Sequence, residues 1–224
     1  MKAFFLSVGW IVAVACGAQQ TTVIDSSYNN AYYQSRMDWF STVGGQKNAT
    51  VFLGNSITER GLWNELLPGH AIMNRGIGGD NTFGLLARLT DVLLYRPKKI
   101  FLLIGINDIG RGHPVPLIAE RYRRIVEIIR SGSPRTKLYL QSVLPLNERM
   151  LTAAYLKGKG DSILALNKTI QSIAAANSAT YVDLYTLFAN EKGELHERYS
   201  LDGIHLKPVA YADWVVYLRT KKYL

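Results

Sequence analysis

The chain has 224 residues, of which 48% are hydrophobic and 19% are charged, and its formal net charge is +9. This composition excludes an intrinsically disordered protein, because the apolar residues suffice for a core, and the length favours one domain over two. The net charge does not indicate a nucleic-acid-binding protein, since the basic residues are scattered and no nucleic-acid-binding motif accompanies them.

The N-terminus has the layout of an export signal. Met1 and Lys2 precede a mainly apolar stretch over residues 3–15, which is too short to span a membrane comfortably. We therefore predict a signal peptide over residues 1–18 and a single domain over residues 19–224. The mature protein would be periplasmic or extracellular.

The single cysteine, Cys16, lies at the end of this apolar stretch. Lipidation of Cys16, as in a bacterial lipoprotein, would tether the protein to a membrane, whereas cleavage near residue 18 would release a soluble protein without cysteine. We favour soluble export, because Ala13 stands where a lipidation signal usually has a larger aliphatic residue. With one cysteine at most, the mature protein depends on core packing rather than on internal disulfides.

Short apolar runs then alternate with longer segments of helical periodicity. The predicted helices cover residues 26–42, 82–94, 116–130, 161–176 and 208–223, and the predicted strands cover 50–53, 71–73, 100–104, 137–142 and 180–184. This alternation predicts an α/β fold with a mostly parallel sheet covered by helices. Residues 100–104 are apolar without interruption, which is typical of a strand that is buried on both faces.

The longest segment without clear periodicity covers residues 144–160, and its end is basic and rich in glycine. Long connections of this kind are often functional. We interpret the segment either as a loop that shapes the substrate site or as a plain surface excursion.

Polar residues follow three of the apolar runs and precede the last helix. In open parallel sheets ligands bind beyond the carboxyl ends of the strands, so these residues are the candidates for chemistry. The four blocks are Gly54-Asn55-Ser56, Gly76-Ile77-Gly78-Gly79-Asp80, Gly105-Ile106-Asn107-Asp108 and Asp202-Gly203-Ile204-His205. Together they contain a serine, a histidine and an aspartate, the set that makes a serine hydroxyl nucleophilic.

In this order the four blocks resemble those of the SGNH hydrolases, also called the GDSL lipase and esterase family. They are similar above all to the branch of platelet-activating-factor acetylhydrolase catalytic subunits and bacterial carbohydrate acetylesterases. The resemblance covers nearly the whole mature chain. It implies a three-layer α/β/α sandwich with a five-stranded, flavodoxin-like sheet, and an enzyme that needs no metal or organic cofactor.

The resemblance assigns Ser56 as nucleophile, His205 as general base and Asp202 as its partner. It assigns Gly79 and Asn107 as oxyanion-hole donors beside the backbone N–H of Ser56. Elementary chemistry reaches similar roles, because attack on an ester places negative charge on an oxygen that N–H groups can stabilise. The D-x-x-H spacing also lets a short turn bring Asp202 to one ring nitrogen of His205.

Three features leave alternatives open. Asn55 replaces the aspartate of the GDSL label, although its side-chain oxygen can still stabilise the turn. Taken alone, Ser56 could be a helix cap, with Glu59 completing a capping box. Asp183, at the end of a predicted strand, is the alternative acid, although we favour a structural role for it.

Other polar residues carry no second site. His70, His113 and His196 are predicted to be exposed loop residues, and none forms a zinc-like cluster. A dinucleotide site is disfavoured, because Asn81 occupies the last glycine position of a G-x-G-x-x-G motif counted from Gly76. No phosphate-binding P-loop motif is present either.

We therefore expect an exported serine esterase that hydrolyses short-chain acyl esters, in particular O-acetyl groups on carbohydrates, through an acyl-Ser56 intermediate. The substrate would be a small molecule or a glycan ester, and nucleic acid would not be a partner. A lysophospholipase or thioesterase is one alternative, and a catalytically silent carbohydrate-binding module is another. Four aromatic residues could stack on sugars, although we favour buried packing for each, because aromatic rings carry a large apolar area: Trp39, Trp63, Tyr155 and Tyr199.

Overall fold

The structure, a computed structural model, describes Met1 and residues 25–224. The predicted signal peptide and Cys16 lie outside the described residues, so export, lipidation and the domain boundary remain predictions. Among the described residues, no helix is long and apolar enough to cross a membrane.

The centre of the molecule is a sheet of five parallel strands in the order β2-β1-β3-β4-β5. The strands are β1 Thr50–Gly54, β2 Ile72–Gly76, β3 Lys99–Leu103, β4 Lys137–Gln141 and β5 Thr180–Val182. Gly54 at the end of β1 is in register with Gly76 of β2 and Leu103 of β3, so the carboxyl ends of these three strands share one edge. The predicted α/β fold is confirmed.

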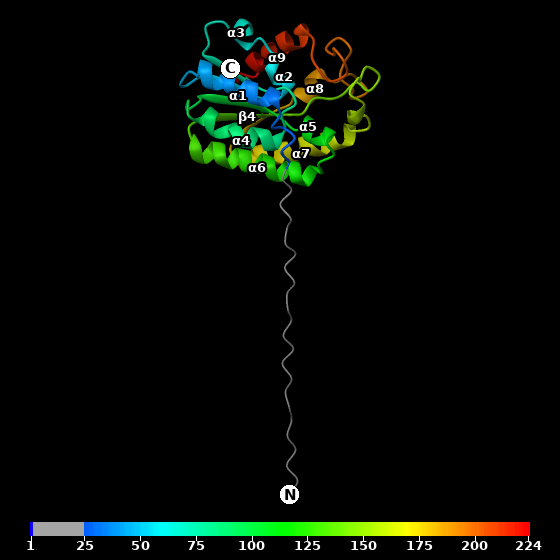
Figure 1. Cartoon of the computed structure of the whole chain (residues 1–224). Helices are drawn as coiled ribbons and strands as arrows, with labels where there is room; N and C mark the ends of the chain where they lie inside the picture. Colours follow the sequence, from blue (N-terminus) through cyan, green and yellow to red (C-terminus); the bar gives the residue numbers. More distant parts are fainter. Residues whose placement is uncertain (2–24) are drawn as a thin grey trace.

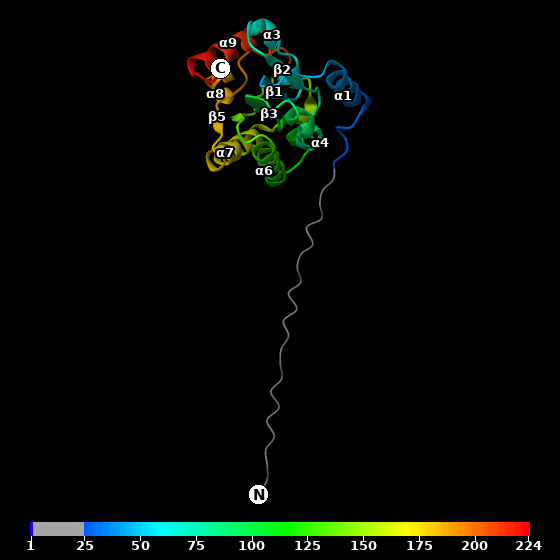
Figure 2. The ribbon, with the colours of Figure 1, turned by 90° about the vertical axis from the view of Figure 1, so that its left-hand side faces the viewer.

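Helices cover both faces of this sheet. They are α1 Ala31–Val43, α2 Ser56–Glu59, α3 Trp63–Leu66, α4 Thr82–Leu93, α5 Ile106–Gly110, α6 Val115–Gly132, α7 Gly160–Ala176, α8 Leu184–Phe188 and α9 Pro208–Thr220, with a short 3₁₀ turn, η1, at Ala154–Leu156. The long helices α4, α6 and α7 pack side by side on one face, and α9 lies with α3 and α8 on the other (Figure 1). Helix α1 stands beside the edge strand β2 (Figure 2).

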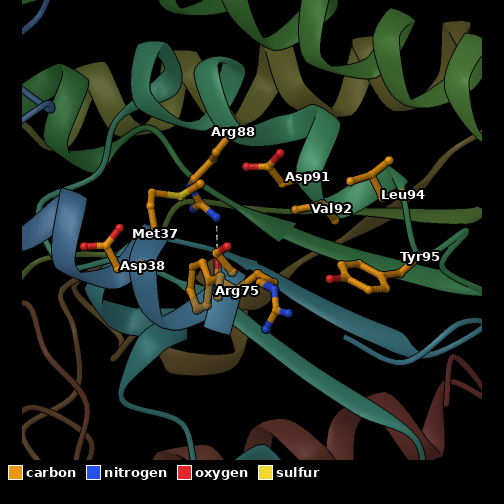
Figure 3. A pocket seen from close by; sticks show the side chains of 10 residues that line it. Met37, Asp38, Arg75, Arg88, Asp91, Val92, Leu94 and Tyr95 are labelled. Atoms are coloured by element: carbon orange, nitrogen blue, oxygen red, sulfur yellow. Dashed lines mark hydrogen bonds between the residues drawn. The ribbon is translucent and has the colours of Figure 1, made fainter. Parts of the chain in front are cut away.

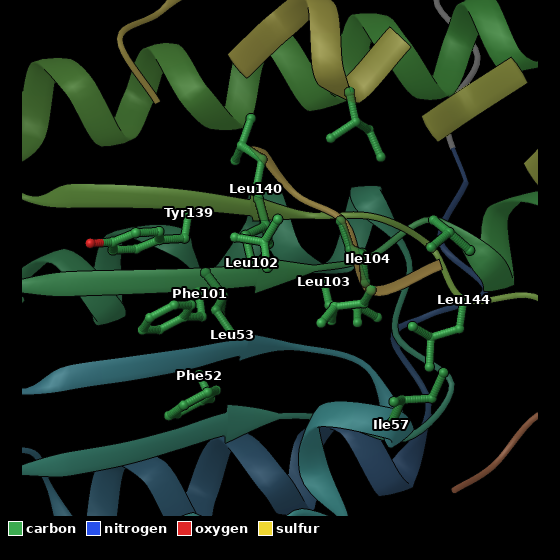
Figure 4. Close-up of a cluster of buried hydrophobic side chains, with 14 of the residues drawn as sticks. Phe52, Leu53, Ile57, Phe101, Leu102, Leu103, Ile104, Tyr139, Leu140 and Leu144 are labelled. Carbon is green, nitrogen blue, oxygen red and sulfur yellow. The ribbon is translucent and has the colours of Figure 1, made fainter. Parts of the chain in front are cut away.

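A stack of aromatic rings crosses the sheet. Phe52, Phe101 and Tyr139 occupy matching positions on three neighbouring strands, with ring centroids 5.1 and 4.5 Å apart (Figure 4). Trp63 stacks on Phe52 at 3.8 Å and is only 1% exposed. Trp63, a candidate for sugar stacking, is therefore a core residue, since its ring has no open face.

The five long helices match the predicted segments closely, but the short ones were missed. Helices α2 and α5 begin two and three residues after the last residues of β1 and β3, where the predicted segments include no helix. Helices of one turn are too short to show a 3.6-residue periodicity, so pattern analysis has no signal for them. Helix α1 begins at Ala31 rather than near residue 26, because the side chain of Asn30 accepts a hydrogen bond from the N–H of Tyr33 and caps it.

Candidate active site

The loop between β1 and α2 presents Ser56 at the edge of the sheet. The side chain of Asn55 accepts a hydrogen bond from the N–H of Ile57 at 3.0 Å and caps α2, so Ser56 is the first helical residue and not the cap. At Gly54, two residues before the nucleophile, a Cβ atom would lie 2.1 Å from the carbonyl oxygen of Leu103, so only glycine fits at this position. Asn55 thus performs the turn-stabilising role that its side-chain oxygen suggested.

Ser56, His205 and Asp202 lie in one hydrogen-bonded chain. The Oγ of Ser56 is 3.0 Å from the Nε2 of His205, and the Nδ1 of His205 is 2.7 Å from the Oδ2 of Asp202. The side chains of His205 and Asp202 are 18% and 27% exposed, so the chain of groups is open to solvent at one side. The structure therefore brings together the three residues that the motifs named.

The carboxylate of Asp202 is held by more than the imidazole. Its Oδ1 accepts hydrogen bonds from the backbone N–H groups of Ile204 at 3.2 Å and His205 at 2.8 Å. Partial burial would raise the pKa of Asp202, but the hydrogen bonds from the His205 ring and from the two N–H groups outweigh burial and lower the pKa below its ordinary value. Asp202 is therefore ionised at neutral pH and can hold a proton on the Nδ1 of His205.

Gly79 and Asn107, the candidate oxyanion-hole donors, are linked through Asp80. Gly79 is exposed with φ +77°, and a Cβ atom there would point into open space. The side-chain amide of Asn107, in the first turn of α5, donates a hydrogen bond to the carbonyl oxygen of Asp80 at 2.7 Å. An amide carries two N–H groups, so Asn107 can make this bond and still offer a donor to a ligand.

A buried ion pair fixes the turn that contains Gly79. The guanidinium of Arg88 donates two hydrogen bonds to the Oδ2 of Asp80, at 2.8 and 2.9 Å, and both side chains are almost fully buried. It also donates to the carbonyl oxygen of Arg75 at 2.9 Å (Figure 3) and to that of Gly54 at 3.0 Å. Arg88 therefore joins the ends of β1 and β2 to the turn that contains Gly79, the candidate oxyanion turn.

Burial raises the pKa of Asp80 to about 6, although the charge of Arg88 opposes this shift. The sequence motifs assigned no role to Asp80 or Arg88. One signal was available, because Arg88 lies on the apolar face of its helix, between Leu85 and Leu89, which are both fully buried. A charged residue at such a position needs a buried partner.

The residue after Asn107 ties α5 to α4. Asp108 is buried and accepts hydrogen bonds from the N–H and the hydroxyl of Thr82, at 3.1 and 2.5 Å. His113 lies 3.8 Å from Asp108 and 3.5 Å from Asp25, with a side chain only 15% exposed. The prediction that His113 is an exposed loop residue is therefore wrong, because two carboxylates draw the imidazole inward.

Segment 144–160 braces the loop that carries the acid and the histidine. The N–H of Asn147 donates to the carbonyl oxygen of Gly203 at 2.9 Å, and the N–H of Thr152 donates to that of Asp202 at 3.3 Å. Asn147 is fully buried, and its side-chain amide also donates to the carbonyl oxygen of Leu195 at 2.9 Å. The segment is therefore not a plain surface excursion, because it supports the D-x-x-H loop, and a role in shaping the substrate site stays a prediction.

The remaining candidate residues do not belong to the hydrogen-bonded chain of Ser56, His205 and Asp202. Asp183, the alternative acid, caps α8 by accepting hydrogen bonds from the N–H of Thr186 at 3.0 Å and from its hydroxyl at 2.7 Å. His70 and His196 are exposed, as predicted. In the described residues, no group of three or more histidine, cysteine, aspartate or glutamate side chains could hold a metal ion. The arrangement that remains is suited to nucleophilic attack by Ser56 on a carbonyl carbon.

Comparison with known proteins agrees with this geometry. The chain is 27% identical over 168 residues to human platelet-activating factor acetylhydrolase IB subunit alpha1. The aligned residues cover 72% of this chain and 69% of that protein. A GDSL-like lipase from Bacteroides thetaiotaomicron superposes with a TM-score of 0.73 at 22% identity, covering 86% of this chain and 98% of that one. An acetylxylan esterase from Geobacillus stearothermophilus has a TM-score of 0.62 at 19% identity, with coverage of 78% and 94%.

The model of the GDSL-like lipase/acylhydrolase family matches residues 41–212, a span that includes all four sequence blocks. The resemblance inferred from the motifs is thereby confirmed. This chain belongs to the GDSL-like lipase/acylhydrolase family and is a hydrolase of the esterase type.

Proposed function

We propose that this chain is an exported serine esterase that removes short acyl groups, in particular O-acetyl groups, from carbohydrates. The observation that carries the proposal is the Ser56–His205–Asp202 chain of hydrogen bonds, which lies half-exposed near the exposed turn at Gly79. An open site of this kind admits a bulky alcohol such as a glycan. Export rests on the layout of residues 1–18.

In the proposed reaction Ser56 is the nucleophile. Its Oγ attacks the ester carbonyl carbon while the Nε2 of His205 takes the hydroxyl proton, and N–H groups of Ser56, Gly79 and Asn107 stabilise the oxyanion. The same proton then passes to the departing alkoxide, which leaves as the alcohol. Water, deprotonated by His205, attacks the acyl-Ser56 ester, and the proton returns to Oγ as the carboxylic acid leaves. Asp202 orients His205 throughout.

The names of similar proteins support a short acyl group. The human relative is named an acetylhydrolase, and the Geobacillus protein that shares the fold is named an acetylxylan esterase.

The test is hydrolysis of p-nitrophenyl esters from acetate to long-chain acids by the purified protein, with Ser56→Ala as the matched inactive control. We expect a steep fall in kcat/KM beyond short acids and loss of activity in the variant. Acetate release from acetylated xylan then tests the carbohydrate. A preference for long acyl chains would favour the lysophospholipase or thioesterase alternative. Sugar binding without Ser56-dependent turnover would favour the silent binding module.

A further inference from the structure

One face of α1 carries an exposed row of side chains. Tyr32, Arg36 and Trp39 are spaced by four and three residues, so they lie on the same side of the helix. Tyr32 is 52% exposed and Trp39 is 58% exposed. Single exposed aromatic residues are common on protein surfaces. This row is of functional interest because it lies beside the active site.

The first residue of this row touches the oxyanion turn. The Tyr32 hydroxyl donates to the Oε1 of Glu59 at 2.7 Å, and Glu59 ends the short helix that Ser56 begins. A Cβ atom at Gly78 would lie 3.2 Å from the Tyr32 ring, and Gly78 directly precedes Gly79. The exposed ring of Tyr32 is therefore held at the edge of the active site.

The second residue continues the row away from the site. The Nε of Arg36 lies 2.8 Å from the same Oε1 of Glu59. The Nη2 of Arg36 also donates to the carbonyl oxygen of Gly76 at 3.4 Å. The ion pair neutralises the charge of Arg36, so its other N–H groups can donate to neutral groups of a ligand. The carboxylate of Glu59 thus contacts both Tyr32 and Arg36 and holds their side chains in place.

The third residue, Trp39, lies at the far end of the row and lines a cavity. Trp39 and Arg36 line a cavity of about 430 Å³ together with Gln46, Asn64 and Asn74. With a rise of about 1.5 Å per residue, Trp39 lies roughly 10 Å along α1 from Tyr32. Figure 2 shows that α1 stands at the rim of the molecule, so a long ligand has access to it.

This chemistry suits a sugar chain. The flat face of an aromatic ring covers the apolar C–H face of a sugar, while amide and guanidinium groups bond its hydroxyls. A stable protein partner would bury about 800 Å² on each side of the interface, which is more than a row of three side chains supplies. The row also precedes residue 41, where the match to the family model begins, so it is not part of the shared family segment.

We propose that Tyr32, Arg36 and Trp39 form a glycan subsite that holds the neutral sugar units next to the acetylated unit at Ser56. This inference rests on the proposed function, because it names the carbohydrate part of the same substrate. The subsite would lower KM for oligosaccharides and leave small esters unaffected.

The test compares Trp39→Ala with Val216→Ala, which removes an equally exposed apolar side chain, 59% exposed, from α9. Both variants are assayed on p-nitrophenyl acetate and on acetylated xylo-oligosaccharides of increasing length. We expect Trp39→Ala to lose about ten-fold in kcat/KM on the longer oligosaccharides, mainly through KM, as for the loss of one stacking contact. Trp39→Phe should restore most of it, and Val216→Ala should match the original protein.

Several outcomes would overturn the subsite. Equal losses on p-nitrophenyl acetate would mean that Trp39 acts through the catalytic groups. Equal activity of Trp39→Ala and the original protein at every oligosaccharide length would remove the subsite but leave the esterase function intact.

A separate measurement covers failure of the proposed function itself. If the protein cleaves p-nitrophenyl acetate but no acetylated oligosaccharide, binding of unacetylated xylohexaose to Ser56→Ala is followed by tryptophan fluorescence. Saturable binding that Trp39→Ala abolishes would uphold the subsite. Absence of binding, or binding to phospholipid vesicles instead, would overturn it.

Discussion

The two sides of the candidate active site are held in place by different forces. On the oxyanion side, the buried pair of Arg88 and Asp80 locks the turn at Gly79 to the ends of two strands. On the other side, Asp202 and His205 are half-exposed, and hydrogen bonds from segment 144–160 brace their loop.

This difference fits the proposed roles of the two sides. Oxyanion donors work best when they are rigid and already aimed at the developing charge, and a buried ion pair supplies that rigidity at the risk of a large loss if one partner is removed. An imidazole that gains and loses a proton needs orientation more than burial. We therefore expect removal of the buried Arg88 to affect mainly folding, and removal of the negative charge of Asp202 to affect mainly turnover.

The largest effect should come from Asp202→Asn. The new side-chain oxygen can keep the two backbone hydrogen bonds, which turns the amide nitrogen toward the Nδ1 of His205. That ring nitrogen must then accept, so Nε2 carries the proton and cannot take one from Ser56. We expect kcat to fall on the order of 10³- to 10⁴-fold, with the thermal midpoint nearly unchanged.

Asp183→Asn is the matched control for this change, because Asp183 caps α8. It should retain its activity on p-nitrophenyl acetate. Normal turnover in folded Asp202→Asn, together with loss of turnover in Asp183→Asn, would reverse the assignment of the acid.

On the oxyanion side, Arg88→Leu should destabilise the fold by about 3–5 kcal/mol, since it leaves the carboxyl group of Asp80 buried without its partner. Urea unfolding followed by circular dichroism measures this loss. The control is Arg124→Leu, which removes an exposed ion pair with Glu127 and should change stability by about 1 kcal/mol or less. If Arg88→Leu and Arg124→Leu lowered the free energy of unfolding equally, burial of the ion pair would not explain the loss expected for Arg88→Leu.

Asn107→Ala should lower kcat on the order of 10²- to 10³-fold, as expected for loss of one oxyanion donor. In Asn107→Asp the side chain keeps its shape but has no N–H groups, so kcat should fall at least as far. Steady-state kinetics on p-nitrophenyl acetate compares the two variants. Full activity in either variant would remove Asn107 from the oxyanion hole.

Asn147→Ala probes the brace on the acid–base side. It leaves the carbonyl oxygen of Leu195 without its donor, which should cost about 1–3 kcal/mol. The backbone hydrogen bond to Gly203 remains, so kcat should fall by about ten-fold or less. Hydrogen exchange over residues 200–206 should become faster. Unchanged exchange would mean that Asn147 does not brace this loop.

The smallest effect concerns stability in acid. Because hydrogen bonds lower the pKa of Asp202, its contribution to stability is complete above about pH 4 and is lost as the pH falls through the lowered value. Asp80 behaves in the opposite way. Since its pKa is raised to about 6, its ionisation opposes folding increasingly as the pH rises from about 4 to about 6.

Asp202→Asn should therefore lose less thermal stability than the original protein below about pH 4. Thermal unfolding across this range measures the difference. Parallel curves for the two proteins would contradict the lowered pKa of Asp202.

Much of the candidate site was predictable because its residues form local motifs. The spacing of Asp202 and His205 already implied their contact, and Ser56 followed a clear apolar run. Arg88 and Asn147 were not predicted, because their partners are backbone carbonyls and a carboxylate brought close only by the fold. His113 was predicted wrongly for the same reason, since Asp25 and Asp108 are distant from each other in the sequence.

By itself, the sequence determined the parallel α/β architecture, the five strands and the order of the four blocks. Apolar runs and helical periodicity are local properties of a chain, and short motifs keep their members together however the rest folds. Tertiary structure alone decided which polar residues are buried, which groups brace the triad, and that Trp63 lies in the core while Trp39 lies on the surface. Those outcomes depend on contacts between distant segments, which exist only once the sheet has brought its strand ends to one edge.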